Sequence, residues 1–331
     1  MKITCLGAGV WGFCLARLLA TKGHTVTLWA KEEKEIRTID QTKTHPRLPG
    51  RPIGTNVRCI ADLAAAIHDV DLLVEAVTSS GVRQVFQQMK ITVGIPKVPI
   101  VIASKGIEQN SGLILPEVVL AVAGEEYRPF ITLLSGPSFA NEVSKDLPTA
   151  VVCGNYEAQT ALQVVEAFST VAFRVYPNSD IKGVAFGGAL KNIIAIACGI
   201  CDGLGLGTGA KAALMTRGLH EMVRFARSQG CLIETLYGLS GMGDLFLTSS
   251  EQSRNYRFGK LLSQGFTADQ AKKEIGMVVE GAYTCIAALQ IAHLTIALPI
   301  TEAVHEIIAG RLAPQSAVEL LMQRTIKEER L

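Results

Sequence analysis

The sequence predicts an N-terminal α/β domain with a doubly wound sheet, followed by an all-α C-terminal domain. Short apolar strand patterns alternate with helix patterns through the first half of the chain, and tight hairpin signals such as Asn-Gly are absent there. From about residue 184 the patterns are those of long helices. We place the boundary near residue 187, which gives domains of 1–187 and 188–331.

The strands expected in the first domain are short and apolar. A helix is expected over residues 11–21, and an Ala-rich helix follows Asp62, whose carboxylate is a good N-cap. Because strands and helices alternate, we expect a mainly parallel sheet. The strands are expected at Ile3–Leu6, Thr25–Trp29, Asp71–Val77, Pro99–Ala103, Phe130–Leu134 and Ala150–Cys153.

Helical periodicity fills most of the second domain. Four alternating glycines, at 203, 205, 207 and 209, follow the first helix, and we interpret them as a turn because no strand precedes them. That helix is apolar enough to resemble a membrane span, but Lys191 and Asn192 in its middle argue against one. Helices are expected over residues 184–201, 209–229, 267–274, 281–294, 301–309 and 315–328.

Composition and charge narrow the class of protein. The 331 residues are 48% hydrophobic and 19% charged, enough to bury a sizeable core. The formal net charge of +2 argues against a nucleic-acid-binding protein that relies on bulk electrostatics. The apolar residues 3–20 contain glycines and Arg17, unlike a signal peptide, so we expect a cytoplasmic protein.

The eight cysteines do not form the pattern of a disulfide framework. Most of them lie in apolar runs, where a free cysteine packs as a small hydrophobic side chain. Cys198 and Cys201 form a CxxC, but no further metal ligands lie nearby in the sequence. We therefore expect two packed cysteines and no metal site.

The motif with the clearest chemistry is a glycine loop at the N-terminus. The segment Gly7–Gly12 has the GxGxxG pattern, follows a strand and opens a helix. Gly7 permits a tight turn, Gly9 lets a pyrophosphate approach the backbone, and Gly12 lets helix and strand pack closely. The helix N-terminus attracts phosphate groups. The motif predicts a Rossmann-type dinucleotide site.

The end of the second strand bears on the choice of dinucleotide. Folds selective for NAD often place an acidic residue there to bind the ribose 2′-hydroxyl. Here Lys31 could face the 2′-phosphate of NADP, whereas Glu32 and Glu33 complicate that interpretation. We expect NADP(H), with NAD(H) tolerated.

Several polar residues lie where a ligand is expected. Lys105 and the segment Gly136–Ala140 follow strands, and α/β sheets bind ligands beyond the carboxyl ends of their strands. Lys191 lies in an apolar helix, and a buried lysine usually has a partner or a task. Gly241–Asp244 and Thr248 come next along the chain, and Arg254 then supplies a cation suited to phosphate.

In order and spacing, these stretches resemble the bacterial NAD(P)-dependent glycerol-3-phosphate dehydrogenases over nearly the full chain. The matching segments are Gly7–Gly12, Ser104–Gly106, Ser135–Ala140, Gly187–Asn192, Gly241–Asp244, Ser253–Asn255, Arg257–Gly259, Val279–Gly281 and Pro299–Glu302. The resemblance implies hydride transfer between NAD(P)(H) and the pair sn-glycerol 3-phosphate and dihydroxyacetone phosphate, feeding glycerophospholipid synthesis.

The same resemblance implies residue roles, with Lys191 as the general acid/base. The substrate-binding residues it implies are Lys105, Gly136, Ser138, Lys191, Asn192, Asp244, Thr248, Ser253, Arg254 and Asn255. The cofactor-binding residues it implies are Gly7, Gly9, Val10, Trp11, Gly12, Lys31, Lys105, Ala140, Arg254, Val278 and Glu280. Val10, Thr78 and Gly209 depart from the family pattern, which bears on cofactor affinity more than on reaction type.

Alternative functions stay open at this point. A related two-domain dehydrogenase acting on a β-hydroxyacid or on ketopantoate would share the domain order and a catalytic lysine, but Gly241–Asp244 and Ser253–Asn255 favour glycerol phosphate. A nucleotide sensor would not need the retained charged residues, and a membrane-bound flavin enzyme would need a longer chain. The sequence leaves the oligomeric state open, a homodimer included, as well as the physiological direction.

Overall fold

The computed structural model describes residues 1–293, 295–326 and 328–329. The chain divides into two compact units, one of Met1–Ser104 with Ile114–Val184 and the other of Lys105–Leu113 with Ala185–Leu331. The short segment 105–113 therefore belongs to the second unit, although both flanking segments belong to the first. The sequence analysis did not predict that residues 105–113 belong to the second unit.

The first unit is built on a sheet of eight strands in the order β3-β2-β1-β4-β5-β6-β7-β8. Neighbouring strands run parallel except β6 and β7, which are antiparallel. The predicted fold class, a mainly parallel doubly wound sheet, is confirmed. The strands are β1 (Lys2–Leu6), β2 (Thr25–Trp29), β3 (Val57–Ile60), β4 (Leu72–Glu75), β5 (Ile100–Ile102), β6 (Ile131–Ser135), β7 (Thr149–Asn155) and β8 (Phe173–Asn178).

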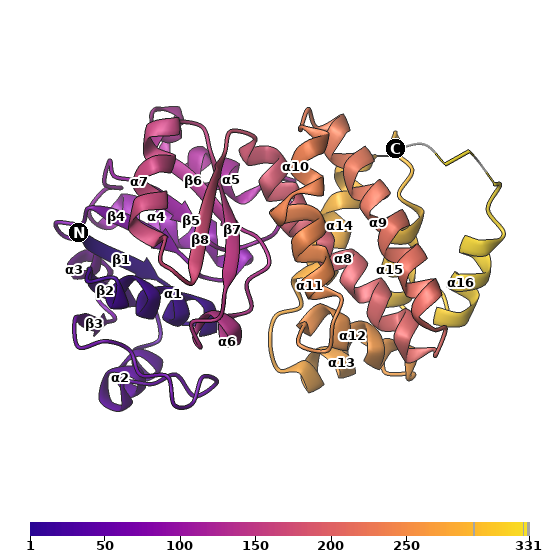
Figure 1. The fold of residues 1–331 in the computed structure, drawn as a ribbon, viewed down its shortest axis with the longest axis horizontal. Coiled ribbons are helices and arrows are strands. Elements are labelled where there is room, and N and C mark those ends of the chain that lie inside the picture. Colours follow the sequence, from indigo (N-terminus) through magenta and orange to yellow (C-terminus); the bar gives the residue numbers. More distant parts are fainter. Residues whose placement is uncertain (294, 327, 330–331) are drawn as a thin grey trace. The chain divides into compact units, whose positions relative to one another are not determined.

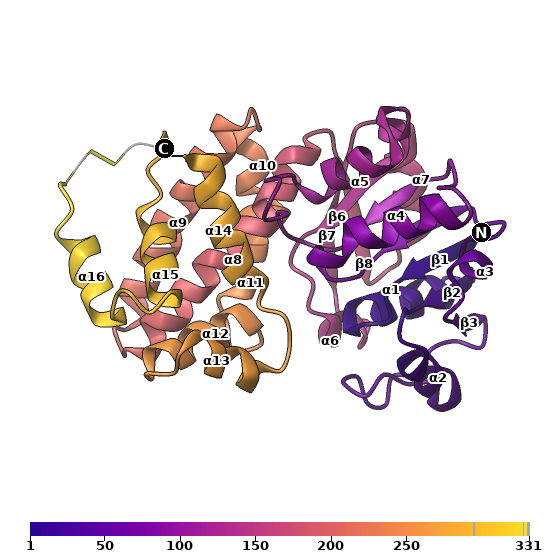
Figure 2. The ribbon, with the colours of Figure 1, turned by 180° about the vertical axis from the view of Figure 1, so that it is seen from behind.

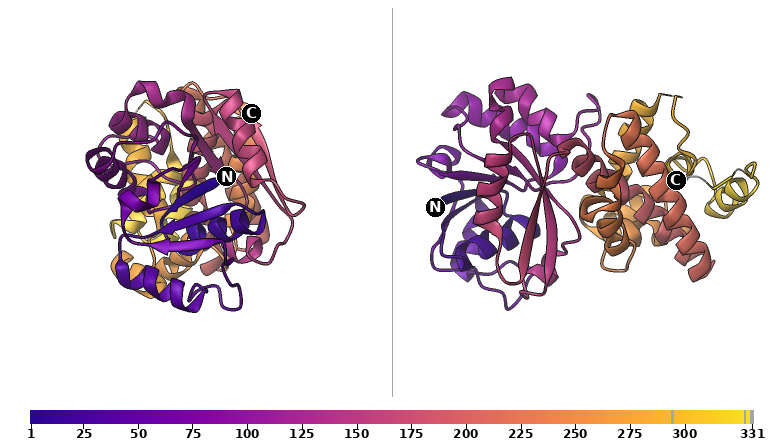
Figure 3. Two further views of the ribbon diagram at one scale, coloured as in Figure 1. Left: turned by 90° about the vertical axis from the view of Figure 1, so that its left-hand side faces the viewer. Right: turned by 45° about the horizontal axis from the view of Figure 1, so that its top comes forward.

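Two strands were not predicted, and both lie at the ends of the sheet. β3 has one buried residue, and β8 alternates buried and exposed residues along its first half. Figure 3 shows the long strands β7 and β8 side by side, as their parallel register requires. Strands at a sheet edge bury fewer apolar side chains, so their sequence signal is weaker.

Helices cover both faces of this sheet. α1 and α7 lie over one face (Figure 1), and α4 and α5 lie over the other (Figure 2). The predicted N-cap is confirmed, because the Asp62 carboxylate accepts the N–H groups of Ala64 and Ala65 at 2.9 and 3.2 Å. The helices are α1 (Val10–Thr21), α2 (Glu33–Thr42), α3 (Leu63–Ile67), α4 (Val82–Thr92), α5 (Leu115–Ala123), α6 (Ala140–Val143) and α7 (Ala158–Phe168).

The second unit is helical in its described residues. The predicted helices 281–294 and 315–328 are too long: the observed ones end at Ala292 and Met322, and residues 294 and 327 lie outside the described residues. α10, α11 and α12 were not predicted. The helices are α8 (Ile181–Gly203), α9 (Thr208–Ser228), α10 (Ile233–Tyr237), α11 (Asp244–Thr248), α12 (Arg254–Ser263), α13 (Ala268–Ile275), α14 (Glu280–Ala292), α15 (Pro299–Ile308) and α16 (Pro314–Met322).

Helix α8 is the core of the second unit. It is long and apolar enough to cross a membrane, but its most apolar window is entirely buried inside the protein, as in a core helix. Two glycines bring it against α12: a methyl group added at Gly199 would lie 1.9 Å from the Tyr256 carbonyl oxygen, and one at Gly259 would lie 2.0 Å from that of Ile196. This backbone contact fixes the first half of α12 against the C-terminal half of α8.

Candidate active site

The glycine loop joins β1 to α1. Its backbone is tightly packed at Gly7 and Gly12, whereas the space beside Gly9 is open. Gly7 has φ +113°, and a methyl group added there would lie 2.5 Å from the Ala76 carbonyl oxygen. At Gly12 it would lie 1.9 Å from the Gly7 carbonyl oxygen. At Gly9 no atom of the described residues lies within 4 Å of the added carbon. The open space at Gly9 faces the uncapped start of a helix, which fits a pyrophosphate.

The remaining candidate residues of the first unit follow β2 and β6. Lys31 is exposed two residues beyond β2. After β6, Gly136 has φ +139°, and the Ser138 hydroxyl donates to its carbonyl oxygen at 3.1 Å. Ala140 begins α6, and its carbonyl oxygen accepts from Cys14 Sγ of α1 at 3.4 Å. The Gly136–Ala140 segment therefore contacts the helix that the glycine loop opens.

A cluster of charged side chains lies buried in the second unit. Lys191 Nζ donates to Asp244 Oδ1 at 2.9 Å and to Thr248 Oγ1 at 2.6 Å. Lys105 Nζ donates to the other carboxylate oxygen, Asp244 Oδ2, at 2.5 Å. Lys191 is 6% exposed and Asp244 is 2% exposed, so the contacts lie away from water. The structure brings together four residues that span much of the sequence.

Close backbone packing places the carboxylate of this cluster. Asp244 and Thr248 lie four residues apart on α11, so both side chains point from one face of the helix. The turn before α11 packs tightly at two glycines: a methyl group at Gly241 would lie 2.0 Å from the Leu236 carbonyl oxygen, and one at Gly187 on α8 would lie 3.1 Å from that of Ser240. Small residues thus allow α11 to approach the helix that carries Lys191.

The electrostatics of the cluster favour a lysine that titrates near neutral pH. Burial lowers the pKa of Lys191 to about 8; Asp244 opposes this shift, and Lys105 and Arg254 add to it. Burial opposes the ionisation of Asp244, yet Lys105 and Lys191 together hold the pKa of that carboxyl below its ordinary value. In the structure the effect of burial on Lys191 therefore outweighs that of Asp244. Such a lysine can donate and accept a proton at physiological pH.

Two asparagines tie three helices together beside the cluster. Asn255 Nδ2 of α12 donates to Asn192 Oδ1 of α8 at 2.9 Å. Asn255 Oδ1 accepts the backbone N–H of Gly281, at the start of α14, also at 2.9 Å. Asn192 is 4% exposed and Asn255 7%. Both were predicted to bind substrate; in this structure their amides hold α8, α12 and α14 in place, and the predicted role stays a prediction.

The start of α12 combines a helix N-terminus with a cation. Ser253 is the N-cap, and its Oγ accepts the backbone N–H of Tyr256 at 3.4 Å. Arg254 is the first helical residue and is exposed. Both features attract an anion to the same point. Val278 and Glu280, the other candidates in this unit, flank the N-cap of α14.

Among the buried acids that sequence reasoning missed is Glu221 of α9, which is 3% exposed. A signal was available, because Glu221 stands between the apolar residues Leu219, Met222 and Val223 on a helix. An acid on the apolar side of a helical pattern is as unusual as the lysine at position 191.

This fold and these residues define a class of protein. It is the class of dehydrogenases that hold a nicotinamide dinucleotide on a glycine loop and carry a buried lysine in a helical unit. The family model of the NAD-dependent glycerol-3-phosphate dehydrogenase N-terminus matches residues 2–161, and that of the C-terminus matches residues 180–319. The chain belongs to this family, and the predicted family, enzyme class and use of NAD(P) are confirmed.

Individual relatives agree over the full length. Glycerol-3-phosphate dehydrogenase [NAD(P)+] of Protochlamydia amoebophila (strain UWE25) is 55% identical, over 100% of this chain and 99% of its own length. The enzyme of the same name from Chlamydia pneumoniae is 51% identical, over 98% and 97%. The crystal structure of glycerol-3-phosphate dehydrogenase from Coxiella burnetii is similar with a TM-score of 0.92 and 39% identity, covering 98% of this chain and 99% of that one.

Proposed function

We propose that this chain interconverts sn-glycerol 3-phosphate and dihydroxyacetone phosphate with NAD(P)(H). The observation that carries the proposal is the ammonium group of Lys191, buried against Asp244 and Thr248 in a chain of this family. A buried cation with a pKa near neutral suits the proton transfer that ketone reduction needs.

Each group has a separate task in this proposal. A nicotinamide dinucleotide held by the Gly7–Gly12 loop would supply the hydride for C2 of the ketone, or accept it in the reverse direction. Lys191 donates the proton to the C2 oxygen in reduction and removes it in oxidation, while Asp244 and Thr248 orient the amine through their hydrogen bonds. Arg254 and the N-terminus of α12 hold the phosphate, and the Gly7–Gly12 loop holds the dinucleotide.

A substrate panel tests this function directly. Oxidation of NADPH and of NADH is measured with dihydroxyacetone phosphate, unphosphorylated dihydroxyacetone, ketopantoate and a β-keto acid. We expect the highest kcat/KM with dihydroxyacetone phosphate, because the phosphate adds binding energy that orients the ketone. Preference for ketopantoate or the keto acid would replace the proposed substrate pair by the alternative that the sequence left open.

Arg254→Ala is expected to weaken recognition of the phosphate specifically. Loss of one charge-assisted contact costs about 1.5–3 kcal/mol, which corresponds to roughly a 10- to 150-fold lower kcat/KM with dihydroxyacetone phosphate. The unphosphorylated ketone should be little affected. Lys260→Ala is the matched control, since Lys260 lies on the same helix and pairs with Glu251 at the surface. An equal loss for both ketones would show that Arg254 does not hold the phosphate.

Gly9→Val is expected to raise the Kd for the dinucleotide without destabilising the fold. Gly9 has φ −60° and ψ 173°, which any residue adopts, and its added side chain meets open space. The side chain would occupy the place proposed for the pyrophosphate. Gly12→Ala is the comparison, because its methyl group collides with the Gly7 carbonyl and should lower the melting temperature. Unchanged NADPH and NADH affinity in a folded Gly9→Val variant would argue against the proposed loop.

Further proposals concern cofactor preference and setting. NADP(H) is the preferred dinucleotide because Lys31 is exposed beyond β2, where a 2′-phosphate would lie; Lys31→Glu should shift the ratio of kcat/KM values toward NADH. The proposal also includes a role in supplying phospholipid backbones, which the family resemblance implies, and a cytoplasmic location, which the N-terminal residues favour. A homodimer is one of the oligomeric states that the sequence leaves open.

A further inference from the structure

Glu221 is a buried acid outside the lysine–aspartate cluster, and it caps the start of another helix. Its Oε1 accepts the backbone N–H of Ile300 at 2.5 Å, and its Oε2 accepts from the backbone N–H and the hydroxyl of Thr301 at 3.1 and 3.0 Å. Ile300 and Thr301 lie in the first turn of α15, after Pro299. One carboxyl group on α9 therefore binds three donors at the N-terminus of α15.

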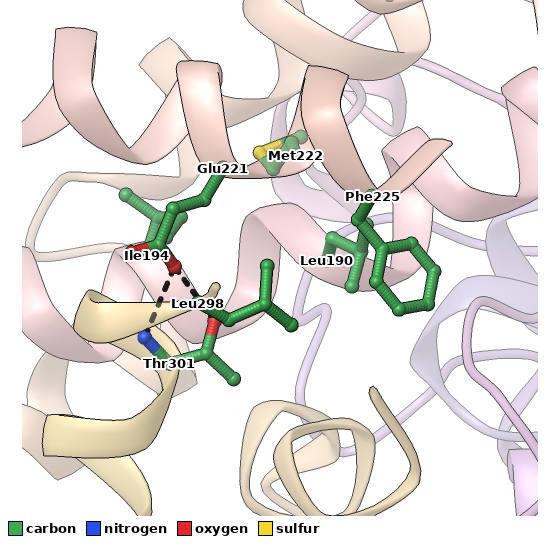
Figure 4. A pocket seen from close by; sticks show the side chains of 7 residues that line it. All are labelled: Leu190, Ile194, Glu221, Met222, Phe225, Leu298 and Thr301. Atoms are coloured by element: carbon green, nitrogen blue, oxygen red, sulfur yellow. Dashed lines mark hydrogen bonds between the residues drawn. The ribbon is translucent and has the colours of Figure 1, made fainter. Parts of the chain in front are cut away.

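The same carboxyl group lies behind the turn of α8 that carries Lys191. Figure 4 shows Glu221 and Thr301 around a small pocket whose other walls include Leu190 and Ile194 of α8. These two residues lie one helical turn apart, and Lys191 and Asn192 come between them in the sequence. The further lining residues are Met222, Phe225 and Leu298.

Helix α9 contacts this turn of α8 directly as well. A methyl group added at Gly218 of α9 would lie 2.5 Å from Ile194 Cγ2, so the α9 backbone itself packs on Ile194. The turn that carries Lys191 thus rests on a surface formed by α9 and α15. The relative position of α9 and α15 depends on the hydrogen bonds of Glu221.

Packing alone does not explain why position 221 carries a carboxyl group. Burial raises the pKa of Glu221 to about 7, against the three hydrogen bonds, which favour the ionised form. Burying an acid is costly, and an apolar side chain would fill the space at lower cost. Unlike an apolar side chain, the Glu221 carboxylate offers two hydrogen-bond acceptors to the N-terminus of α15. These acceptors fix the position of α15 relative to α9.

We propose that Glu221 is a positioning residue for Lys191: by holding α15 onto α9, it fixes the surface against which the Lys191-bearing turn of α8 packs. The expected effect on kcat rests on the proposed acid/base role of Lys191. The expected effect on the position and pKa of Lys191 does not.

Two variants and one control separate positioning from general stability. Glu221→Gln keeps the volume, but it places an amide N–H₂ against the N–H of Ile300 or Thr301. Thr301→Val removes the third donor and keeps the backbone. The control is Asp202→Asn, which removes a carboxylate from the C-terminal end of α8, the helix that carries Lys191. Asp202 accepts from Lys211 Nζ at 2.6 Å and from the Tyr256 hydroxyl at 2.5 Å.

The test combines turnover with a direct titration of the Lys191 amine by ¹⁵N-lysine NMR. We expect Glu221→Gln to lower kcat by roughly 10- to 100-fold, the cost of a small misplacement of a catalytic group, with KM for dihydroxyacetone phosphate nearly unchanged. Thr301→Val should act in the same direction more weakly. Both should shift the pKa of Lys191, and Asp202→Asn should leave kcat and that pKa at the wild-type values.

The outcomes are distinct. If Glu221→Gln lowers only the unfolding midpoint and leaves the Lys191 titration and kcat unchanged, the positioning role is wrong. If Glu221→Gln does not fold, Thr301→Val decides by the same two measurements. If the wild-type chain does not turn over dihydroxyacetone phosphate, the proposed function fails, while the NMR titration still decides whether Glu221 positions Lys191.

Discussion

Lys191→Ala is expected to lower kcat for dihydroxyacetone phosphate reduction by roughly 10²- to 10⁴-fold, the usual contribution of a general acid. The alanine variant has no proton donor at this position, so the developing charge on the C2 oxygen must be neutralised by water. KM should change little, because Arg254 and the N-terminus of α12, proposed to hold the phosphate, remain. Steady-state kinetics with NADPH, together with a melting curve that shows an intact fold, measure the effect.

Lys182→Ala is the matched control for this variant. Lys182 lies on the same helix, but its side chain is 47% exposed and pairs with Glu117 at the surface. Surface ion pairs contribute little, so its kcat should equal that of the wild type. Retention of more than about a tenth of kcat in Lys191→Ala would remove Lys191 from the acid/base role.

Asp244→Asn is expected to lower the free energy of unfolding by about 3–5 kcal/mol at neutral pH, the typical cost of removing one partner from a buried ion pair. The carboxylate is the shared partner of Lys105 and Lys191, and without it two ammonium groups face each other at low exposure. The variant should also lose most of its kcat, because the hydrogen bond that orients Lys191 is changed. Denaturant unfolding and steady-state kinetics measure the two losses.

The loss of stability in Asp244→Asn should depend on pH with a definite sign. Since the pKa of Lys191 is about 8 in the wild type, this lysine is mostly neutral well above that pH, so the wild type itself has then lost the Lys191–Asp244 ion pair that the variant lacks. The destabilisation should therefore be smaller at about pH 9.5 than at neutral pH. Glu251→Gln, which breaks the exposed pair with Lys260, should cost less than about 1 kcal/mol. A comparable, pH-independent cost for both variants would contradict the buried-cluster account.

Local patterns were sufficient to predict much of the fold. The strand Thr25–Trp29 was predicted at the observed residues. The apolar run at Ile100–Ile102 was predicted one residue too long at each end, since buried parallel strands are short continuous apolar runs. The glycine loop was recognisable because its backbone needs, a positive φ at Gly7 and contact at Gly12, can be met by glycine alone. Lys191 stood out because a charge in an apolar helix is costly.

Features set by tertiary contacts could not be predicted in this way. Lys105 lies in the segment that joins the second unit, and its bond to Asp244 connects residues 139 positions apart in the chain. The pairing of Asn192 with Asn255 depends on how α8 and α12 pack, which no local periodicity shows. Glu221 stood out in its helical pattern, but its partners, two backbone N–H groups and the Thr301 hydroxyl, lie about 80 positions further along the chain and leave no local pattern.

The pH dependence of kcat in both directions is the most direct test of Lys191 as the proton-transferring group. Reduction needs the ammonium form, so its kcat should fall as the pH rises through about 8; oxidation of glycerol 3-phosphate needs the neutral amine, so its kcat should rise through the same pKa. Both transitions should disappear in Lys191→Ala. The same transitions in that variant, or rates of the wild type that do not change between about pH 6 and pH 10, would contradict the account.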